Sequence, residues 1–588
     1  MEGSPVTTTS LDWPVANTEH GLLVAFGEFL QQHGLIERLM QVPVKQKTRT
    51  FAPQTKLVEL LAGIMSGMEH LAELNDGPHP VATDSIVARA WGQPGFAHYS
   101  TVSRTLDACD ARTVSAVEQA INDFSRPFID KLVHDLLRRG ESLVYDLDLT
   151  GQAVSATSQT YPGVAFGWMN DRVKLGYQLA RVCLSSVTQE RIWLAGFHHP
   201  GDTVSVSCVQ DLIRAAEAQT GVRPRRRPEL VQQRITAQQA VINRTQQLLE
   251  QQCQTLTRLQ QTRTTLIGKI YHTEQLLKEA LSAQKSADFQ QQVARWRCRL
   301  PRLEKQLTTC QQVITKHQTH LTKQQTILKD LQAWCVQLAQ ENQTNPDPPA
   351  ICEARMDAGF TSGDNLTWLI EMGYCPNTKA PNAQTTTALQ VRLTTQSHWV
   401  RVGDNAEMIA WDDYGLHGCP YPLTVALERF KTGRQYKYAT LIQYRDDGQF
   451  PTLPVWFSHY NERQTIEAGN KEMKGTFFVQ HLMSRSSAGI QLQVLFTGLA
   501  ANVVRWCTPW LQSCASATTP KFQRTLGSPK HLVHMAANTD ALVQQASHGT
   551  TLQFAPHSPL AGLILFLKGV PAFQLSLGFN RPCKIESG

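Results

Sequence analysis

A glutamine-rich stretch with almost no glycine, residues 229–343, constrains the fold of this 588-residue chain more than any other feature. In its second half, apolar residues recur at steps of three and four from Leu300 to Leu338, which is the spacing of a heptad seam. Its first half repeats apolar residues seven apart from Ile235 onward, and residues 282–288 suit a turn. We therefore expect an antiparallel helical hairpin, with arms of ~70 Å or more at ~1.5 Å per residue. A parallel coiled coil between two subunits is the alternative.

Length and composition indicate a globular protein of several domains. A single hydrophobic core rarely grows beyond ~250–300 residues, so a chain of 588 residues predicts two to four domains. Hydrophobic residues make up 41% and charged residues 18%, which is near the globular average and argues against wholesale disorder. The formal net charge of +7 fits a polyanionic partner without requiring one.

Cysteine usage and hydropathy point to a soluble cytoplasmic protein. The 13 cysteines include no CxxC pair, which favours reduced thiols over a disulfide framework and also argues against a zinc site. Residues Met1–Ser10 lack the pattern of a signal peptide. The longest apolar run, Leu560–Leu567, is far shorter than the ~20 residues that span a bilayer, so we expect no membrane association.

The N-terminal part of the chain has the pattern of a helical domain. Apolar residues at helical spacing predict a helix over residues 55–75, and a shorter helix fits Asp84–Trp91. A serine or threonine cap followed by a short basic helix, as in Ser100–Leu106, is how many helix-turn-helix recognition helices begin. We therefore expect residues 1–138 to bind DNA, with Arg104 among the contacts. The plainer interpretation is one more helix in a bundle.

Strand patterns begin at residue 141. Three apolar runs of strand length are followed by a helical pattern, which is the opening of a ribonuclease-H-like domain and also of other α/β folds. Another strand and helix follow the glutamine-rich stretch, and alternating residues then predict antiparallel strands until helices return at about residue 459. The expected strands are 141–150, 176–186, 191–199, 350–360 and five runs within 385–457 (ALQVRLTT, HWVRVGD, MIAWDDYG, YKYATLIQY and LPVWFS), and the expected helices are 204–220 and 362–372.

These patterns divide the chain into five parts, of which the α/β core is interrupted twice. The last part holds several Pro and Gly residues and is weakly informative. The expected boundaries are 1–138 for the helical DNA-binding domain, 139–222, 350–384 and 456–512 for the catalytic core, 223–349 for the hairpin insertion, 385–455 for a β-rich insertion and 513–588 for the C-terminal region.

Three acidic residues stand where an α/β protein gathers its ligand-binding groups. Asp148 is expected at the end of the first strand, Asp357 at the end of a later strand and Glu467 on a helix. Hard cations prefer oxygen ligands, and two Mg²⁺ ions ~4 Å apart can flank a phosphate. The three residues therefore predict a site for Mg²⁺ or Mn²⁺ that supports phosphoryl transfer. Asp146 competes with Asp148 for the first position, because alternate residues of a strand share one face.

The segment around Glu467 carries the most specific pattern. Its key residues match YxxRxxxExxxxxxK and, on one helix, would form a single stripe. An arginine and a lysine beside a metal-binding glutamate suit contacts with phosphates. A solvated amphipathic helix with ion pairs is the alternative. The matching residues are Tyr460, Arg463, Glu467 and Lys474.

This segment resembles the Y-R-E-K signature of bacterial insertion-sequence DDE transposases of the insertion-sequence-four superfamily. The strand that contains Asp148, with Thr150 two residues later, is similar to their first acidic motif, and Arg355–Phe360 is similar to their second. The resemblance covers roughly residues 50–510, with the hairpin as an insertion. It implies a ribonuclease-H-like fold with a catalytic triad of Asp148, Asp357 and Glu467 and with DNA contacts from Tyr460, Arg463 and Lys474.

The resemblance also implies an activity and its partners. A homodimer in the bacterial cytoplasm, associated with the nucleoid, would bind the terminal inverted repeats of its own element as double-stranded DNA. Metal-dependent cleavage at the repeat ends would then be followed by strand transfer into target DNA. A basic cluster before the hairpin would either add phosphate contacts or serve as a solvated linker. That cluster consists of Arg223, Arg225, Arg226 and Arg227.

Two other functions fit parts of the sequence. The string DLDLT matches the DxDxT opening of haloacid-dehalogenase-like phosphatases, in which Asp146 would be the nucleophile and Asp148 the general acid. That interpretation needs a later paired-acid motif, of which Gly363-Asp364 is a partial match. A non-catalytic coiled-coil scaffold that binds DNA would explain the hairpin but not the placement of the acids. An inactivated relative of a transposase is an intermediate possibility. Because all three acids are present, the sequence gives no sign of inactivation.

Overall fold

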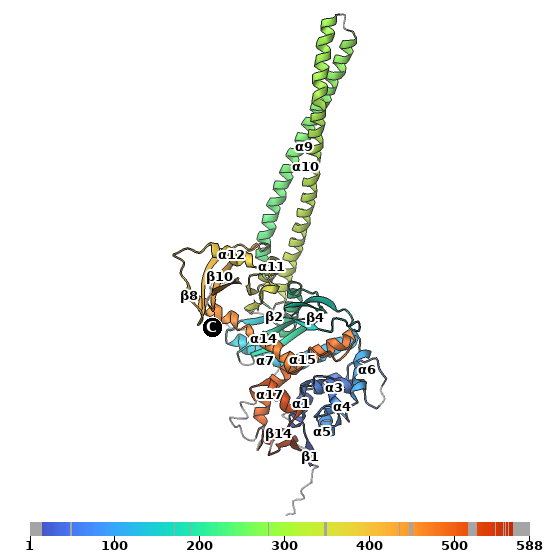
Figure 1. Ribbon diagram of the computed structural model, residues 1–588, viewed down its shortest axis with the longest axis vertical. Helices are drawn as coiled ribbons and strands as arrows, with labels where there is room; N and C mark the ends of the chain where they lie inside the picture. The colour runs from blue at the N-terminus through green and yellow to red at the C-terminus, as the bar shows by residue number, and fades with distance from the viewer. Residues whose placement is uncertain are drawn as a thin grey trace, which may run out of the picture. The chain divides into compact units, whose positions relative to one another are not determined.

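The computed structural model of the protein describes residues 15–47, 50–169, 171–187, 190–279, 282–345, 350–433, 435–445, 451–515, 526–546, 549–556, 558, 560–561 and 564–568. Within these residues the chain is a mixed α/β protein that divides into two compact units (Figure 1). The first unit comprises Met1–Pro224, Pro348–Ile370 and Tyr374–Gly588. The second comprises Arg225–Asp347 and Glu371–Gly373.

The second unit is a helical hairpin. Helices α9 (Pro228–Lys278) and α10 (Ala283–Gln343) run side by side (Figure 1). From the tip toward the base, contacts between the two helices join Glu274 to Arg297, Arg263 to Glu304, Gln252 to Cys310 and Gln238 to Gln324. The antiparallel hairpin within one chain is therefore confirmed. The turn predicted at 282–288 is wrong in extent, because α10 already begins at Ala283, capped by the side chain of Ser282.

The first unit opens with a series of helices, most of them short, that bury many apolar side chains. They are α1 (Gly21–Gln32), α2 (Leu35–Met40), α3 (Pro53–Met65), α4 (Glu73–Asp76), α5 (Ser85–Ala90), α6 (Tyr99–Ala108) and α7 (Ala111–Arg138). The expected helices near Asp84–Trp91 and Ser100–Leu106 are confirmed as α5 and α6. The single helix predicted over 55–75 is wrong. The backbone of Gly67 turns to a φ of 74°, which ends the helical path and separates α3 from α4.

A ten-stranded mixed sheet forms the centre of the first unit. Its strands are β2 (Leu143–Ala153), β3 (Ala165–Met169), β4 (Arg172–Ser186), β5 (Glu190–Pro200), β6 (Cys352–Arg355), β7 (Cys375–Lys379), β8 (Val400–Arg401), β9 (Ala406–Tyr414), β10 (Leu423–Thr432) and β11 (Gln435–Gln443). Their order is β3-β4-β2-β6-β7-β11-β10-β9-β8, with β5 also paired to β4. β2 is antiparallel to β4 and parallel to β6, and β6 is parallel to β7. Residues Leu175–Leu184 of β4 are buried without interruption, which indicates cover on both faces of the sheet.

Helices follow the core strands. They are α8 (Val209–Thr220), α11 (Gly363–Glu371), α12 (Ala383–Val391), α13 (Leu453–Asn461), α14 (Gln464–Gly475) and α15 (Ser487–Cys514), with short 3₁₀ turns η1 (Val81–Thr83), η2 (Ser205–Cys208) and η3 (Ala358–Phe360). α8 and α15 both pack against β5. The helix expected at 204–220 is confirmed from Val209 onward, and the helix expected at 362–372 is confirmed as α11.

The region 385–455 extends the core sheet, so its expected boundary as a separate β-rich insertion does not match the strand pairing. β11 pairs with β7 in antiparallel register, Ile442 opposite Thr378, and so joins the preceding core strands. Two expected strands in this region are helices. ALQVRLTT overlaps α12, which Asn382 caps, and LPVWFS lies in α13, where Pro454 occupies the first turn.

A second, four-stranded sheet joins the two ends of the described chain. Strand β1 (Val15–Thr18) pairs with β12 (Ala541–Ala546), β12 pairs with β13 (Gly549–Phe554), and β13 pairs with β14 (Ile564–Lys568). Helix α17 (Pro529–Ala537) precedes β12. The sequence patterns predicted none of these elements.

Among the described residues, one helix is long and apolar enough to cross a membrane by length and composition. It is α15, and 72% of its most apolar window is buried inside the protein. Arg505 of this helix forms an ion pair with Glu472 at 2.9 Å. Such burial is the behaviour of a core helix.

Candidate active site

Asp148 lies on β2, an interior strand of the ten-stranded sheet between β4 and β6. The expectation that it ends its strand is wrong, because β2 continues to Ala153 and Asp148 stands in its middle. Its partner across the antiparallel pair with β4 is Arg181. The Asp148 side chain is largely buried but reaches the site described below.

Asp146, the competing acid, is committed to a structural ion pair. Nε and Nη2 of Arg355 donate to its two carboxylate oxygens at 2.7 and 2.8 Å, and both side chains are 0% exposed. Nη1 of Arg355 also donates to the backbone oxygen of His459 at 2.6 Å. Because Asp146 stands opposite Arg355 in the parallel register of β2 and β6, this pair fastens the two strands together. The geometry therefore favours Asp148 over Asp146 as the chemically available acid.

Asp357 follows β6 by two residues. Its carboxylate caps the 3₁₀ turn η3 by accepting the N–H of Gly359 at 2.8 Å, which fixes the direction of the side chain. Since β6 is the parallel neighbour of β2, the end of β6 carries Asp357 toward Asp148. The prediction of an acid at this strand end is confirmed.

The Y-R-E-K residues do not share one helix, so the predicted single stripe is wrong. α13 ends at Asn461 and α14 begins at Gln464, and Arg463 stands at the junction. Tyr460 is buried on α13, and its hydroxyl donates to the backbone oxygen of Met356 at 3.1 Å. Tyr460 is therefore unsuited to the DNA contact expected of it. It holds the backbone beside Asp357 instead.

Arg463 is the centre of the site. Its Nη2 lies 2.8 Å from Oδ1 of Asp148 and 3.7 Å from Oδ2 of Asp357. Its Nη1 lies 3.0 Å from Oε1 of Glu467 on α14. Burial alone would lower the pKa of this guanidinium, but the surrounding carboxylates raise it on balance, so Arg463 stays charged. Three carboxylates from three distant segments thus meet around one cation.

Burial and repulsion from neighbouring carboxylates oppose the ionisation of Asp148. Burial raises the pKa of Asp148 to about 6; Arg463 opposes this shift, and the carboxylates of Asp357 and Glu467 add to it. The side chains of Asp357 and Glu467 are 43% and 56% exposed, so two of the three acids face solvent. Carboxylate oxygens with access to solvent are the kind of donor that a hard divalent cation prefers.

Two further residues of the site were missed by sequence reasoning. The Asn470 side-chain amide donates to Oδ2 of Asp148 and accepts from Nη1 of Arg181, the latter at 3.3 Å. Burial lowers the pKa of Arg181 to about 9, and Asp148 opposes that shift. Lys474 lies near the same charges. Burial lowers its pKa, and Arg181 adds to the effect. Asn470 follows Glu467 by one helical turn, which was the available sequence signal.

The four arginines of the basic cluster before the hairpin differ in exposure: two are buried and two reach solvent. Arg226 is 0% exposed, forms an ion pair with Glu341 at 2.7 Å and donates to the backbone oxygen of Met372 at 2.9 Å. Arg227 is buried as well. The expectation that these two contact phosphates is therefore wrong, because both side chains are buried and the charge of Arg226 is paired at the base of the hairpin. Arg225 is exposed and Arg223 is half-buried.

Arg104 lies on the exposed face of α6, as a DNA contact requires. Its Nε donates to the backbone oxygen of Ser100, one turn earlier, at 3.0 Å. This contact leaves the rest of the guanidinium facing solvent. Its expected role in DNA binding stays a prediction.

Asp148→Asn is expected to stabilise the protein above pH 6 but not near pH 4. The folded pKa of about 6 exceeds the ordinary 3.8, so stability is lost as the pH rises through this interval and the ionised carboxylate opposes folding above it. In chelator-containing buffer, the free energy of unfolding at pH 8 should rise by about 1–3 kcal/mol, measured by urea denaturation. Asp364→Asn, at an exposed acid of α11, is the control. Equal effects of Asp148→Asn at both pH values would contradict the electrostatic account.

No protein-family model matches the chain, and comparison with curated proteins finds no match either. The most distinctive feature of the site is the convergence of Asp148, Asp357 and Glu467 on Arg463.

Proposed function

We propose that the protein is a DDE-type DNA transposase that cleaves and joins DNA strands by metal-dependent phosphoryl transfer. The observation that carries the proposal is the meeting of Asp148, Asp357 and Glu467 around the guanidinium of Arg463. These residues come from a central strand, from the end of its parallel neighbour and from a helix. They are also the residues that the transposase resemblance singles out.

The strand order supports a ribonuclease-H-like core as the setting for this site. The run β5-β4-β2-β6-β7 has two antiparallel pairs followed by two parallel pairs. That is the strand arrangement of ribonuclease-H-like folds, in which the first acid stands on the central strand. Asp148 and Asp357 occupy the corresponding places on β2 and after β6.

Asp148, Asp357 and Glu467 would hold Mg²⁺, or Mn²⁺ in its place, through carboxylate oxygens. When bound there, divalent cations activate the attacking hydroxyl and stabilise the leaving oxygen. Arg463 keeps the three carboxylates together, and with a phosphate present its guanidinium offers planar, paired donors to the phosphate oxygens. The chain's main contribution is in-line positioning in a site of fixed charge.

The proposed partner is double-stranded DNA, which the protein would bind both at the terminal inverted repeats and at the target. The net charge of +7 and the exposed Arg104 on α6 favour binding to a polyanion. Arg225, Arg223 and Lys474 are the remaining phosphate-contact candidates, since Arg226 and Arg227 are buried. Binding of this kind weakens strongly with salt, because each phosphate contact releases a counterion.

The phosphatase alternative fits less well. It needs Asp146 as an exposed nucleophile, whereas Asp146 is sealed in its ion pair with Arg355. A pure scaffold would not require acids from three segments to share one guanidinium. We therefore favour an active enzyme. As the transposase resemblance implies, we place it in the bacterial cytoplasm, associated with the nucleoid.

The hairpin is proposed to join two copies of the chain into a homodimer. Helix α9 carries exposed apolar side chains that α10 does not cover, namely Val241, Leu248, Ile267 and Tyr271. A second copy of the hairpin would bury them.

Shortening the hairpin is expected to convert the dimer into a monomer. Gln238 donates to the backbone oxygen of Gln324 at 3.0 Å, so a short glycine-rich loop can close the hairpin beyond this pair and leave its base intact. Sedimentation velocity should show a dimer for the full chain and a monomer for the shortened one. A shortened chain that still sediments as a dimer would exclude the hairpin as the dimer contact.

The direct test of the function is nicking of labelled DNA. The substrate carries the inverted repeats that flank the gene, and the reaction contains Mg²⁺. We expect nicks at the repeat ends in the presence of Mg²⁺ and none when a chelator replaces it.

A further inference from the structure

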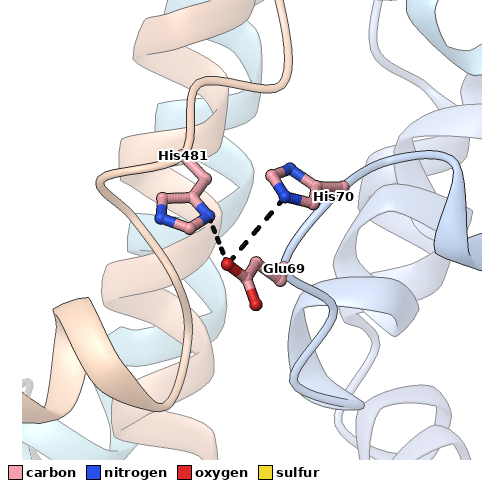
Figure 2. Close-up of side chains that lie close together, drawn as sticks. All are labelled: Glu69, His70 and His481. Atoms are coloured by element: carbon pink, nitrogen blue, oxygen red, sulfur yellow. Dashed lines mark ion pairs between the residues drawn. The ribbon is translucent and has the colours of Figure 1, made fainter. Parts of the chain in front are cut away.

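A second group of metal-ligating side chains lies outside the carboxylate site. Glu69 and His70 lie in the turn between α3 and α4, and His481 lies in the turn between α14 and α15 (Figure 2). Nδ1 of His481 is 3.0 Å and Nε2 of His70 is 3.9 Å from Oε1 of Glu69. Among the described residues, this is the group of three whose ligand atoms all lie within 4.8 Å of one another.

The distances suit a small tetrahedral ion. Zn²⁺ binds imidazole nitrogen and carboxylate oxygen at ~2.0–2.2 Å, which places two ligand atoms of a tetrahedron roughly 3.3–3.5 Å apart. The two separations from Glu69 Oε1 lie on either side of that value. The rings of His70 and His481 stack with centroids 5.1 Å apart, and His70 is exposed enough to rotate toward a shared ion. Two nitrogens and one oxygen, with a fourth position open to water, favour Zn²⁺ over Mg²⁺.

The nitrogen of His481 that faces Glu69 points to a missing ligand. Nδ1 is shielded from solvent and has no hydrogen-bond partner among the described residues. It lies 3.0 Å from Oε1 of Glu69, an ion-pair contact without a hydrogen bond. Buried polar nitrogens are normally satisfied, so an ion at this point would supply the missing interaction. The other ring nitrogen, Nε2, lies 3.3 Å from the amide nitrogen of Gln480, so an ion at Nδ1 requires the Gln480 amide to turn its oxygen toward Nε2 and accept the N–H there.

Both turns are held in place independently of any ion. The carboxylate of Glu73 accepts the backbone N–H groups of Glu69 and His70 at 3.1 and 3.2 Å. The side chain of Gln493 donates to the backbone oxygen of His481 at 2.8 Å. The ligands are therefore presented from a fixed backbone, which reduces the entropy lost on binding.

We propose that Glu69, His70 and His481 bind a Zn²⁺-class transition-metal ion, at a site separate from the carboxylates around Arg463. The ion joins the turn after α3, in the N-terminal helices, to the turn that follows α14, the helix of Glu467. It thereby clips the N-terminal helices to the segment that completes the candidate active site. The cysteine pattern argued against a zinc site, but this donor set contains no cysteine and comes from two distant parts of the sequence.

The test is metal binding by the full-length, tag-free chain, read without any DNA assay. Co²⁺ serves as the probe because its visible absorption is far stronger in tetrahedral than in octahedral sites, and Zn²⁺ is then added to displace it. We expect one tetrahedral site in the wild type. His481→Ala should weaken Zn²⁺ binding at least about tenfold. His534→Ala, at an exposed histidine of α17, should leave binding unchanged.

A second variant distinguishes the loss of a metal ligand from the loss of folding. Glu69→Gln keeps the size of a half-buried side chain and should also weaken Zn²⁺ binding, with an unchanged far-ultraviolet circular dichroism spectrum. No tetrahedral Co²⁺ signal in the wild type would overturn the proposal, and so would equal binding by the wild type and both variants. Asp357→Asn should retain the signal, so failure of this site and failure of the proposed nuclease function are distinguishable.

Discussion

Arg355→Met is expected to destabilise the protein by about 3–5 kcal/mol, which is the usual cost of leaving one member of a buried ion pair without its partner. Asp146 and Arg355 are both 0% exposed and share two hydrogen bonds. Removal of the guanidinium leaves the Asp146 carboxyl buried and also frees the backbone oxygen of His459. Urea denaturation at pH 7 measures the change as a lower midpoint at constant slope.

An exposed ion pair provides the matched control. Arg139 and Glu141 are paired at 2.6 Å with both side chains substantially exposed, so Arg139→Met should change stability by less than about 1 kcal/mol. The double variant Asp146→Leu with Arg355→Met should recover part of the loss, since no charge then remains buried. A cost below about 1 kcal/mol for Arg355→Met alone would show that the pair does not fasten β2 to β6.

Asp357→Asn is expected to reduce DNA nicking by about a thousandfold or more. The amide keeps the shape of the side chain and its contact with the N–H of Gly359, but it removes the negative charge. Metal ions at such sites contribute several kcal/mol to transition-state stabilisation, and each 1.36 kcal/mol corresponds to a tenfold change in rate. Single-turnover nicking of end-labelled repeat DNA measures the loss, while a binding assay shows that the variant still holds DNA.

A variant of the neighbouring acid Asp364 is the control that distinguishes loss of the Asp357 charge from local structural damage. It is exposed on the first turn of α11 and is the residue that a phosphatase would need in its paired-acid motif. Asp364→Asn should nick DNA at the wild-type rate. If Asp357→Asn were as active as wild type, the triad would be wrongly assigned. Loss of activity in Asp364→Asn alone would favour the phosphatase.

The sequence located the acids and the strand that carries the first of them, but not the point at which that strand ends. Residues 141–150 end in an acidic run that suggested a strand terminus. β2 in fact continues to Ala153, and its buried Gln152 donates to the backbone oxygen of Val479. A buried glutamine satisfied by a segment more than three hundred residues away leaves no local trace.

The position of Arg463 was also beyond pattern reasoning. Helical spacing predicted one stripe for Tyr460 through Lys474, because that rule assumes an unbroken helix. The break between α13 and α14 turns the arginine inward to the carboxylates. Arg226 could not be placed from the sequence for the same reason. Its neighbours in the sequence resemble a basic linker, whereas its partner Glu341 lies on the other helix of the hairpin, α10. Partners that are distant in sequence decide whether a charge is buried or free.

The hairpin was the most predictable element. Its heptad seam depends on local periodicity, and helices α9 and α10 confirm it. The terminal sheet was the least predictable, because β1 finds its partner β12 at the other end of the chain. Pairing between distant strands depends on loop closure and tertiary context, which short sequence windows do not contain.

The central claim is tested most directly by nicking of labelled DNA that carries the flanking inverted repeats, in Mg²⁺, by the wild type and Glu467→Gln side by side. Glu467 is exposed, and its carboxylate contact in the site is with Arg463, so the substitution should leave the fold and DNA binding intact. The proposal predicts nicks at the repeat ends by the wild type and none by Glu467→Gln. Equal nicking by both proteins, or none by either with DNA binding retained, would contradict it.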